Sequence, residues 1–195
     1  MDDQPPNQLC TVEWYERIAI LRLVSEDGTN RLSMARVRTL TSAVEQLAFE
    51  SPARLIVTGN TRFFSAGAEL QEIASLTGVE AVRFARMGQA LMNAVASFPA
   101  PTVAAIDGYC MGGGLDLALA CERRIAGRQA VFGHRGAALG LITGWGGTQR
   151  LPRIVGQARA LEMFIAAEKL SSLQALALGL VEAVVDDPLA VALAT

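Results

Sequence analysis

Apolar positions change their period along the N-terminal part of the chain. Residues 11–16 and 18–24 are short runs rich in β-branched side chains, and such a pair predicts a β-hairpin. Helical spacing follows Ser33, which is expected to cap a helix that Pro52 ends. The apolar positions at this spacing are Val37, Leu40, Val44 and Leu47.

Strand-like and helix-like segments then alternate to the end of the sequence. Strands are predicted at 55–57, 102–106, 124–126, 130–132 and 181–185. Helices are predicted at 79–98, 115–121, 149–155 and 158–167, with a short one capped by Ser171 or Ser172 that ends at Gly179. Tight or glycine-rich loops fall at 63–68, 108–114 and 140–147. This alternation predicts an α/β fold in a single domain.

Composition narrows the class of protein. The 195 residues are 51% apolar with a net charge of −2, which argues against a nucleic-acid partner. A mean hydropathy of +0.32 suggests that other subunits cover some apolar surface, as in a homo-oligomer.

The same residues bear on location and metal binding. The acidic, polar start is not a signal peptide, and Pro99 and Pro101 interrupt the uncharged stretch 87–106, so no membrane association is expected. Three cysteines without ligand spacing and one histidine predict buried reduced thiols, no metal site and a cytoplasmic location.

Two loops carry the candidate chemistry. Each follows a strand, contains small residues and leads into a helix: Ser-Ala-Gly-Ala-Glu-Leu at 65–70 and Met-Gly-Gly-Gly-Leu-Asp at 111–116. Small side chains allow close approach, and a helix N-terminus offers free N–H donors. Facing loops of this kind could bind one oxyanion, although the glycines alone could serve only tight turns. The spacing fits neither a dinucleotide fingerprint nor a phosphate loop nor a nucleophile elbow.

Four ordered motifs resemble those of the crotonase (enoyl-CoA hydratase/isomerase) family. They are Phe-Phe-Ser-Ala-Gly-Ala-Glu-Leu at 63–70, Pro-Thr-Val-Ala-Ala-Ile-Asp-Gly-Tyr-Cys-Met-Gly-Gly-Gly at 101–114, Gly-Trp-Gly-Gly-Thr-Gln-Arg-Leu-Pro-Arg at 144–153 and Gly-Leu-Val at 179–181. The resemblance runs from 11 to 185. It implies a spiral of ββα repeats and an acyl-CoA thioester substrate, with no further cofactor.

The resemblance also assigns roles to residues of this chain. The thioester oxygen would lie between the backbone N–H groups of Ala68 and Gly113. Ala66, Ala68 and Leu70 would line the pantetheine and adenine, and Arg62 matches a position that contacts CoA phosphate in some members. Arg62 could equally be a solvated turn residue.

The sequence departs from the family's hydratases at the two catalytic glutamates. The first position is Asp116, whose side chain is shorter by one carbon–carbon bond, about 1.5 Å. The second is Gly136, which has no side chain to hold water or exchange a proton. Asp116 is therefore a single acid/base or only a capping carboxylate of its helix. His134, expected near the pocket and titrating near neutrality, is a second catalytic candidate or a packed or solvated loop residue.

A glycine at the Gly136 position is also known in relatives resembling dihydroxynaphthoyl-CoA synthases, where it makes room for an anion. Their catalytic aspartate aligns with Thr143 here, and a dehalogenase-like aspartate aligns with Gly144, so neither activity is transferred. Trp145 and Trp14 are expected in the core or the pocket wall.

Three functions follow as hypotheses. The first is an isomerase or lyase that works through a stabilised thioester enolate. The second is an acyl-thioester decarboxylase or hydrolase, with Gly136 giving room for a substrate carboxylate. The third is an acyl-CoA-binding protein with impaired catalysis.

The predicted organisation is a flexible N-terminus at 1–10, a core domain at 11–187 and a truncated segment at 188–195. The family's C-terminal helices are expected to be short or missing. A trimer or dimer of trimers would require those helices to exist elsewhere.

Overall fold

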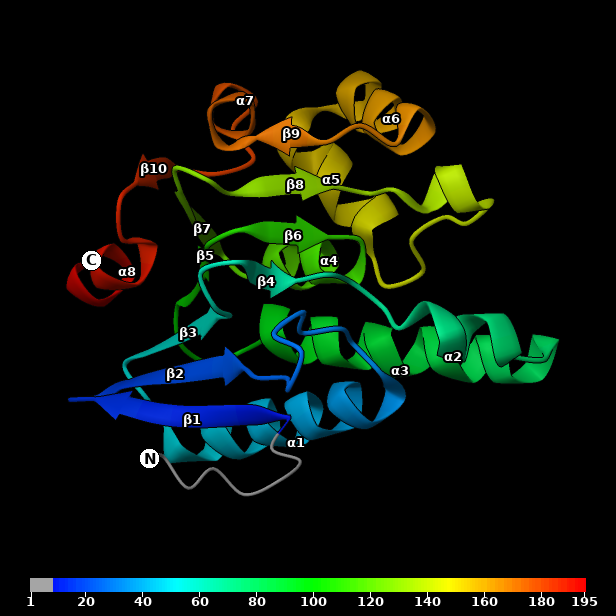
Figure 1. Cartoon of the computed structure of the whole chain (residues 1–195). Helices are drawn as coiled ribbons and strands as arrows, with labels where there is room; N and C mark the ends of the chain where they lie inside the picture. The colour runs from blue at the N-terminus through cyan, green and yellow to red at the C-terminus, as the bar shows by residue number, and fades with distance from the viewer. Residues whose placement is uncertain (1–8) are drawn as a thin grey trace.

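The computed structural model describes residues 9–195, and the chain begins there with the predicted hairpin (Figure 1). Strands β1 (Cys10–Tyr15) and β2 (Ile18–Leu23) pair antiparallel, with Cys10 opposite Leu23. The flexible segment expected at 1–10 falls mostly outside the described residues, but Cys10 already belongs to β1.

A six-stranded sheet forms the first layer. Its order is β1-β2-β3-β5-β7-β10, and all pairs except β1–β2 are parallel. The remaining strands are β3 (Arg54–Thr58), β5 (Thr102–Ile106), β7 (Arg123–Gly127) and β10 (Ala183–Val185). Strands β3 and β5 are almost wholly buried, as expected for parallel strands covered on both faces.

A second sheet of shorter strands stands beside the first. Its order is β4-β6-β8-β9, from β4 (Phe63–Ser65), β6 (Tyr109–Met111), β8 (Val131–Gly133) and β9 (Leu170–Ser171). Each of β4, β6 and β8 directly follows a strand of the larger sheet and precedes helical structure. This repetition confirms the predicted ββα spiral. Strands β4 and β6 fall in segments that had been predicted as loops.

The long helices confirm the positions expected from helical spacing. Helix α1 (Met34–Glu50) begins after Ser33, whose hydroxyl accepts from the backbone N–H of Arg36. Helix α3 (Gly78–Ala96) begins with a capping box between Thr77 and Glu80. The others are α2 (Leu70–Ser75), α4 (Gly113–Ala120), a 3₁₀ turn η1 (Gly136–Leu139), α5 (Gly147–Val155), α6 (Gln157–Ala166), α7 (Ser172–Ala177) and α8 (Pro188–Ala194).

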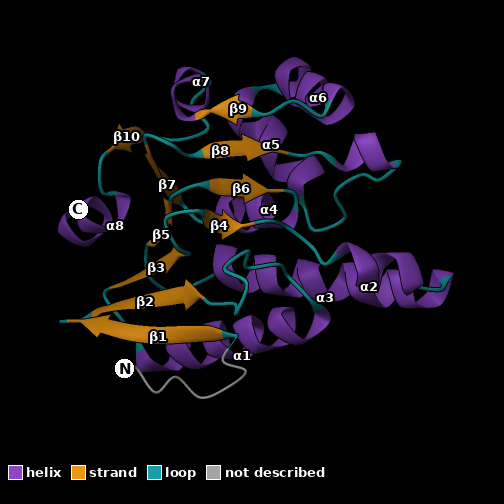
Figure 2. Ribbon diagram, viewed as in Figure 1, coloured by secondary structure: helices purple, strands orange, loops and turns teal. Residues whose placement is uncertain are grey.

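Helices cover both faces of the larger sheet (Figure 2). The main core includes Leu55, Val57 and Ala104. Residues of the same strands with opposite parity, Ile56 and Val103 among them, form a second cluster with Ala192 of α8. The segment predicted as a C-terminal remnant at 188–195 is thus a helix that packs on β3, β5 and β7.

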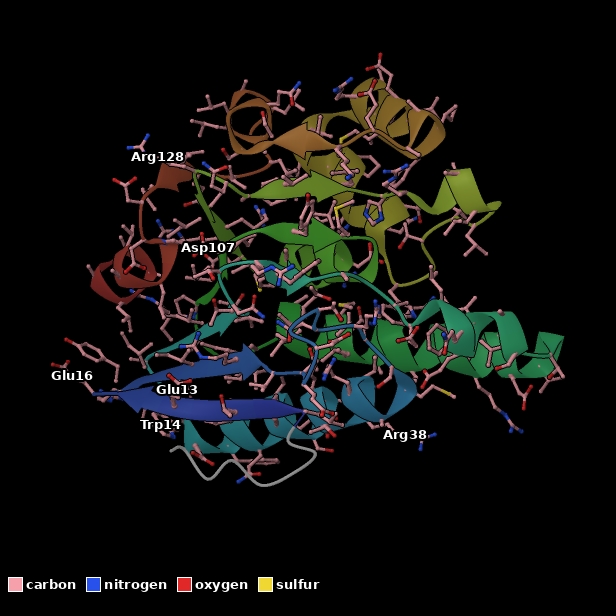
Figure 3. The ribbon with its side chains drawn as sticks, in the orientation of Figure 1. Glu13, Trp14, Glu16, Arg38, Asp107 and Arg128 are labelled. Atoms are coloured by element: carbon pink, nitrogen blue, oxygen red, sulfur yellow. The ribbon has the colours of Figure 1, made fainter. Side chains whose placement is uncertain are left out.

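Two expectations about individual side chains need correction. Trp14 lies on β1 at the edge of the larger sheet, where Figure 3 labels it beside Glu13, and it is 46% exposed instead of buried. Cys110 and Cys121 are buried free thiols, but Cys10 is only partly buried. Within residues 9–195, no helix is long and apolar enough to cross a membrane, and no cluster of His, Cys, Asp or Glu could hold a metal ion.

Candidate active site

Three short parallel strands bring the candidate residues together. Strands β4, β6 and β8 end at the same edge of the smaller sheet, since Ser65 pairs with Cys110 and Met111 with Gly133. The segments that follow carry Ala68, Gly113 with Asp116, and His134, respectively. The carboxyl ends of parallel strands are where open α/β sheets place ligands. Here they border a cavity of about 770 Å³.

The loops after β4 and β6 pack backbone against backbone. A Cβ atom built on Gly67 would lie 2.8 Å from the Met111 carbonyl oxygen and 3.4 Å from the Gly113 nitrogen. One built on Gly113 would lie 3.5 Å from the Ala68 nitrogen and 2.5 Å from the Trp145 ring. Gly67 is therefore required for the contact between the two loops, and Gly113 is required because the Trp145 ring lies against it.

Two backbone donors of these loops are left without a backbone acceptor in the part of the chain that the structure describes. Helix α4 begins after Gly112, which offers no side chain to cap it. Within residues 9–195, the backbone N–H groups of Ala68 and Gly113 donate to no backbone acceptor. Both residues line the cavity. Two free donors of adjacent loops are the chemical requirement for an oxyanion site.

Asp116 lies in the first turn of α4, and its side chain is directed into the cavity wall with 1% exposure. The Thr143 hydroxyl donates to its Oδ2 atom. Its Oδ1 atom lies 3.4 Å from Nε2 of His134, which is 4% exposed. That pair lacks hydrogen-bond geometry, and in the described part of the chain neither atom has any other partner.

Burial controls the protonation of both groups. It raises the pKa of Asp116 to about 7, although the Thr143 hydroxyl, the Arg150 guanidinium and the Gly147 N–H act in the opposite direction. Burial lowers the pKa of His134 to about 4, so the expectation that His134 titrates near neutrality is wrong. Near neutral pH the histidine is therefore uncharged, and the protonated and ionised forms of the Asp116 carboxyl are both populated.

Gly136 borders the cavity, but the direction in which a side chain would extend from it is blocked. A Cβ atom at this residue would lie 2.7 Å from the Leu141 carbonyl oxygen. The Leu141 N–H in turn donates to the Gly136 carbonyl at 2.8 Å, which closes η1 into a tight loop. A backbone oxygen thus occupies the direction in which a side chain at this position would extend, and room for a substrate carboxylate in the cavity beside Gly136 stays a prediction.

The pantetheine and phosphate candidates divide into two groups. Ala66 and Leu70 line the cavity, and their contact with pantetheine or adenine stays a prediction. Arg62 is exposed, is not part of the cavity wall, and lies 5.9 Å from the centre of the Phe63 ring. Tyr109 lies between Phe63 and Lys169. The centres of the Phe63 and Tyr109 rings are 5.4 Å apart, and the Lys169 ammonium lies 5.3 Å from the centre of the Tyr109 ring.

Sequence reasoning missed Lys169 and Arg135, the two cations in the cavity wall. Lys169 is the only lysine in the sequence, a signal that could have singled it out. Arg135 lies beside His134 and has no distinguishing pattern.

Apolar side chains form the opposite part of the wall. Trp145, 3% exposed, lies against the Phe84 ring with 5.1 Å between ring centres, which confirms it as a wall residue. Gly88 of α3 allows this position, because a Cβ atom there would come within 2.2 Å of the indole. The other apolar residues here are Ile73, Leu76, Ala81, Ala85, Leu141 and Ile142.

Comparison with known proteins assigns this architecture to a class. The family model described as enoyl-CoA hydratase/isomerase matches residues 13–192. The chain therefore belongs to the enoyl-CoA hydratase/isomerase, or crotonase, family.

Individual relatives support the same family assignment. A probable enoyl-CoA hydratase of Bacillus subtilis is 45% identical over 84% of this chain and 64% of its own length. The human mitochondrial methylglutaconyl-CoA hydratase is 39% identical over 87% of this chain and 50% of its own length. The structure of Pseudomonas aeruginosa DspI superposes with a TM-score of 0.92 at 36% identity, covering 98% of this chain and 80% of that one. This chain thus spans about half to two thirds of the length of these curated relatives.

Proposed function

We propose that the protein moves a proton at the carbon next to the carbonyl of an acyl-CoA thioester, as an isomerase or lyase and not as a two-glutamate hydratase. The observation that carries the proposal is Asp116, a buried carboxyl whose pKa of about 7 suits proton transfer at neutral pH. It shares one cavity with the free N–H groups of Ala68 and Gly113.

Each group has one task in the proposed step. The N–H groups of Ala68 and Gly113 hold the thioester oxygen. Asp116 takes the α-proton, the C–H electron pair moves onto the carbonyl, and the enolate oxygen is stabilised by the two donors. The carboxyl then returns the proton to the α-carbon or to the γ-carbon of an unsaturated chain. No other reactant is needed.

Substrate binding follows from the polarity of the wall. Lys169 and Arg135 provide positive charge for the CoA phosphates. Arg62 lies outside the cavity wall, but its guanidinium packs over the ring of Phe63, which is part of that wall. The apolar wall around Trp145 and Phe84 suits a hydrocarbon acyl chain. The carbonyl of Leu141 beside Gly136 weighs against a substrate carboxylate there, and so against the decarboxylase alternative.

Deuterium uptake tests the proposal. Wild-type protein should exchange the α-hydrogens of butyryl-CoA in heavy water, and Asp116→Asn should slow this exchange by about 10²–10⁴-fold. The control is Asp186→Asn, an exposed aspartate paired with Arg128. Binding of the thioester, measured by calorimetric titration, should be the same in all three. Equal, measurable exchange in Asp116→Asn and wild type would contradict the role of Asp116, and absence of exchange in both would favour the binding-protein hypothesis.

Hydration gives a second test. Because Gly136 supplies no carboxylate, crotonyl-CoA should be hydrated far more slowly than about 10 s⁻¹, a typical enzymatic rate. The loss of enoyl-thioester absorbance measures it. A rate at or above that value contradicts the claim that the protein is not a standard hydratase.

Self-association is also proposed. Leu161 and Ile165 on α6 and Leu173 on α7 are exposed apolar side chains, which supports burial against other subunits. Sedimentation velocity of the purified chain should give a mass above that of one copy.

A further inference from the structure

Thr143 makes the one side-chain hydrogen bond to Asp116 found among residues 9–195. It comes from the segment between η1 and α5 and reaches across 27 positions of sequence to the first turn of α4. The bond goes to Oδ2. The other oxygen, Oδ1, faces Nε2 of His134 at 3.4 Å, and both of these atoms are buried without a hydrogen-bond partner in the described residues.

One glycine shows how closely the three side chains converge. A Cβ atom built on Gly147 would lie 2.2 Å from Asp116 Oδ1, 2.8 Å from the Thr143 methyl carbon and 3.0 Å from His134 Nε2. Only a residue without a side chain leaves space for this cluster. The two carboxyl oxygens are thus held in different surroundings.

We propose that Thr143 is a positioning residue, which holds Oδ2 of Asp116 and so fixes the orientation of the carboxyl, with Oδ1 opposite His134. This inference rests on the proposed function of Asp116 as the acid/base. In the step, the α-C–H bond breaks, its electron pair moves to the thioester oxygen, and an O–H bond forms on the Asp116 carboxyl. The Thr143 hydroxyl keeps donating to Oδ2 throughout.

The charged and titratable neighbours of Asp116 come from three elements. They are Arg150 of α5, Cys110 of β6 and His134 after β8. Arg150 and the Thr143 hydroxyl favour the ionised carboxylate, while burial opposes it. Removing the hydroxyl should therefore shift the titration of Asp116 upward.

The single histidine offers a probe that does not depend on turnover. His134 is the only imidazole in the sequence, so its ring nitrogen signals in NMR need no further assignment. Because Nε2 lies 3.4 Å from Oδ1, these signals should follow the titration of Asp116 near neutral pH. They should lose this transition in Asp116→Asn.

The experiment compares Thr143→Val, which keeps the shape, with Thr143→Ser, which keeps the hydroxyl. The midpoint sensed by His134 should rise by about one to two pH units in Thr143→Val, as expected for loss of a hydrogen bond to a charged group. Thr143→Ser should restore it. The pH profile of α-deuterium exchange should shift in the same direction. Thr39→Val, whose hydroxyl donates to Ala35 within α1, is the control.

An unchanged midpoint in Thr143→Val overturns the inference. A midpoint in Thr143→Ser that is raised as far as in Thr143→Val overturns it as well. Absence of exchange in wild-type protein would instead overturn the proposed function. The NMR titration would still test the contact between Thr143 and Asp116 in that case.

Discussion

The segments after β6 and β8 occupy equivalent places in successive ββα repeats, yet they provide different chemistry. After β6, helix α4 starts at once, so free N–H donors and the carboxyl of Asp116 lie within one turn. After β8, a 3₁₀ turn and an irregular loop intervene before α5, and they provide His134, Thr143 and Trp145. Neither segment alone makes a site. The first carries the groups that we propose to react, and the second contacts Asp116 through Thr143 and His134.

The largest expected effect belongs to the segment after β6. In Gly113→Ala the new methyl would lie 2.5 Å from the Trp145 ring, so the Gly113 N–H must move. Displacing one oxyanion donor should reduce α-deuterium exchange by about 10²–10³-fold. Gly78→Ala is the matched control, because a Cβ atom at that helix start meets nothing within 4 Å. Equal losses in both variants would contradict the assigned role of Gly113.

The segment after β8 should resist restoration of the second glutamate. In Gly136→Glu the new Cβ would lie 2.7 Å from the Leu141 carbonyl oxygen, which should cost about 1–3 kcal/mol of unfolding free energy. Crotonyl-CoA hydration should not appear. Ala137→Glu adds the same charge at an exposed neighbouring position and should cost less. Urea unfolding measures both, and a stable, hydrating Gly136→Glu would show that the loop is not restrictive.

The two segments should also respond to pH with opposite signs. The folded pKa of Asp116 is about 7, above its ordinary 3.8, and that of His134 is about 4, below its ordinary 6.5. Between pH 4 and 6.5, folding therefore protonates Asp116 and deprotonates His134. As the pH rises through this window, the unfolding free energy falls because of Asp116 and rises because of His134. Each slope is up to about 1.4 kcal/mol per pH unit, so the two slopes cancel.

Single substitutions should remove this cancellation. In Asp116→Asn the His134 contribution is left, so the unfolding free energy should fall relative to wild type as the pH is lowered through that window. In His134→Gln the Asp116 contribution is left, so it should fall relative to wild type as the pH rises toward 7. Urea unfolding at several pH values tests both. Curves parallel to that of wild type would mean that the two groups do not titrate as described.

Local sequence determined most of the framework. The hairpin, α1, β5 and the helix starts at Ser33 and Ser171 follow from apolar periodicity and capping residues, which act over a few neighbouring positions. The short strands β4 and β6 escaped prediction because three residues between glycines carry no period of their own. They exist because they pair in parallel with distant segments.

The site divides in the same way. The small-residue loops around Ala68 and Gly113 and the acid at Asp116 could be identified from sequence, because close backbone approach and helix N-termini require particular residue types nearby. Tertiary structure alone decided that burial outweighs the helix N-terminus in setting the pKa of Asp116 and that His134 stays uncharged. It also placed the Leu141 carbonyl where a side chain at Gly136 would extend. Each of these depends on contacts between segments far apart in the chain, since desolvation and packing are properties of the assembled fold.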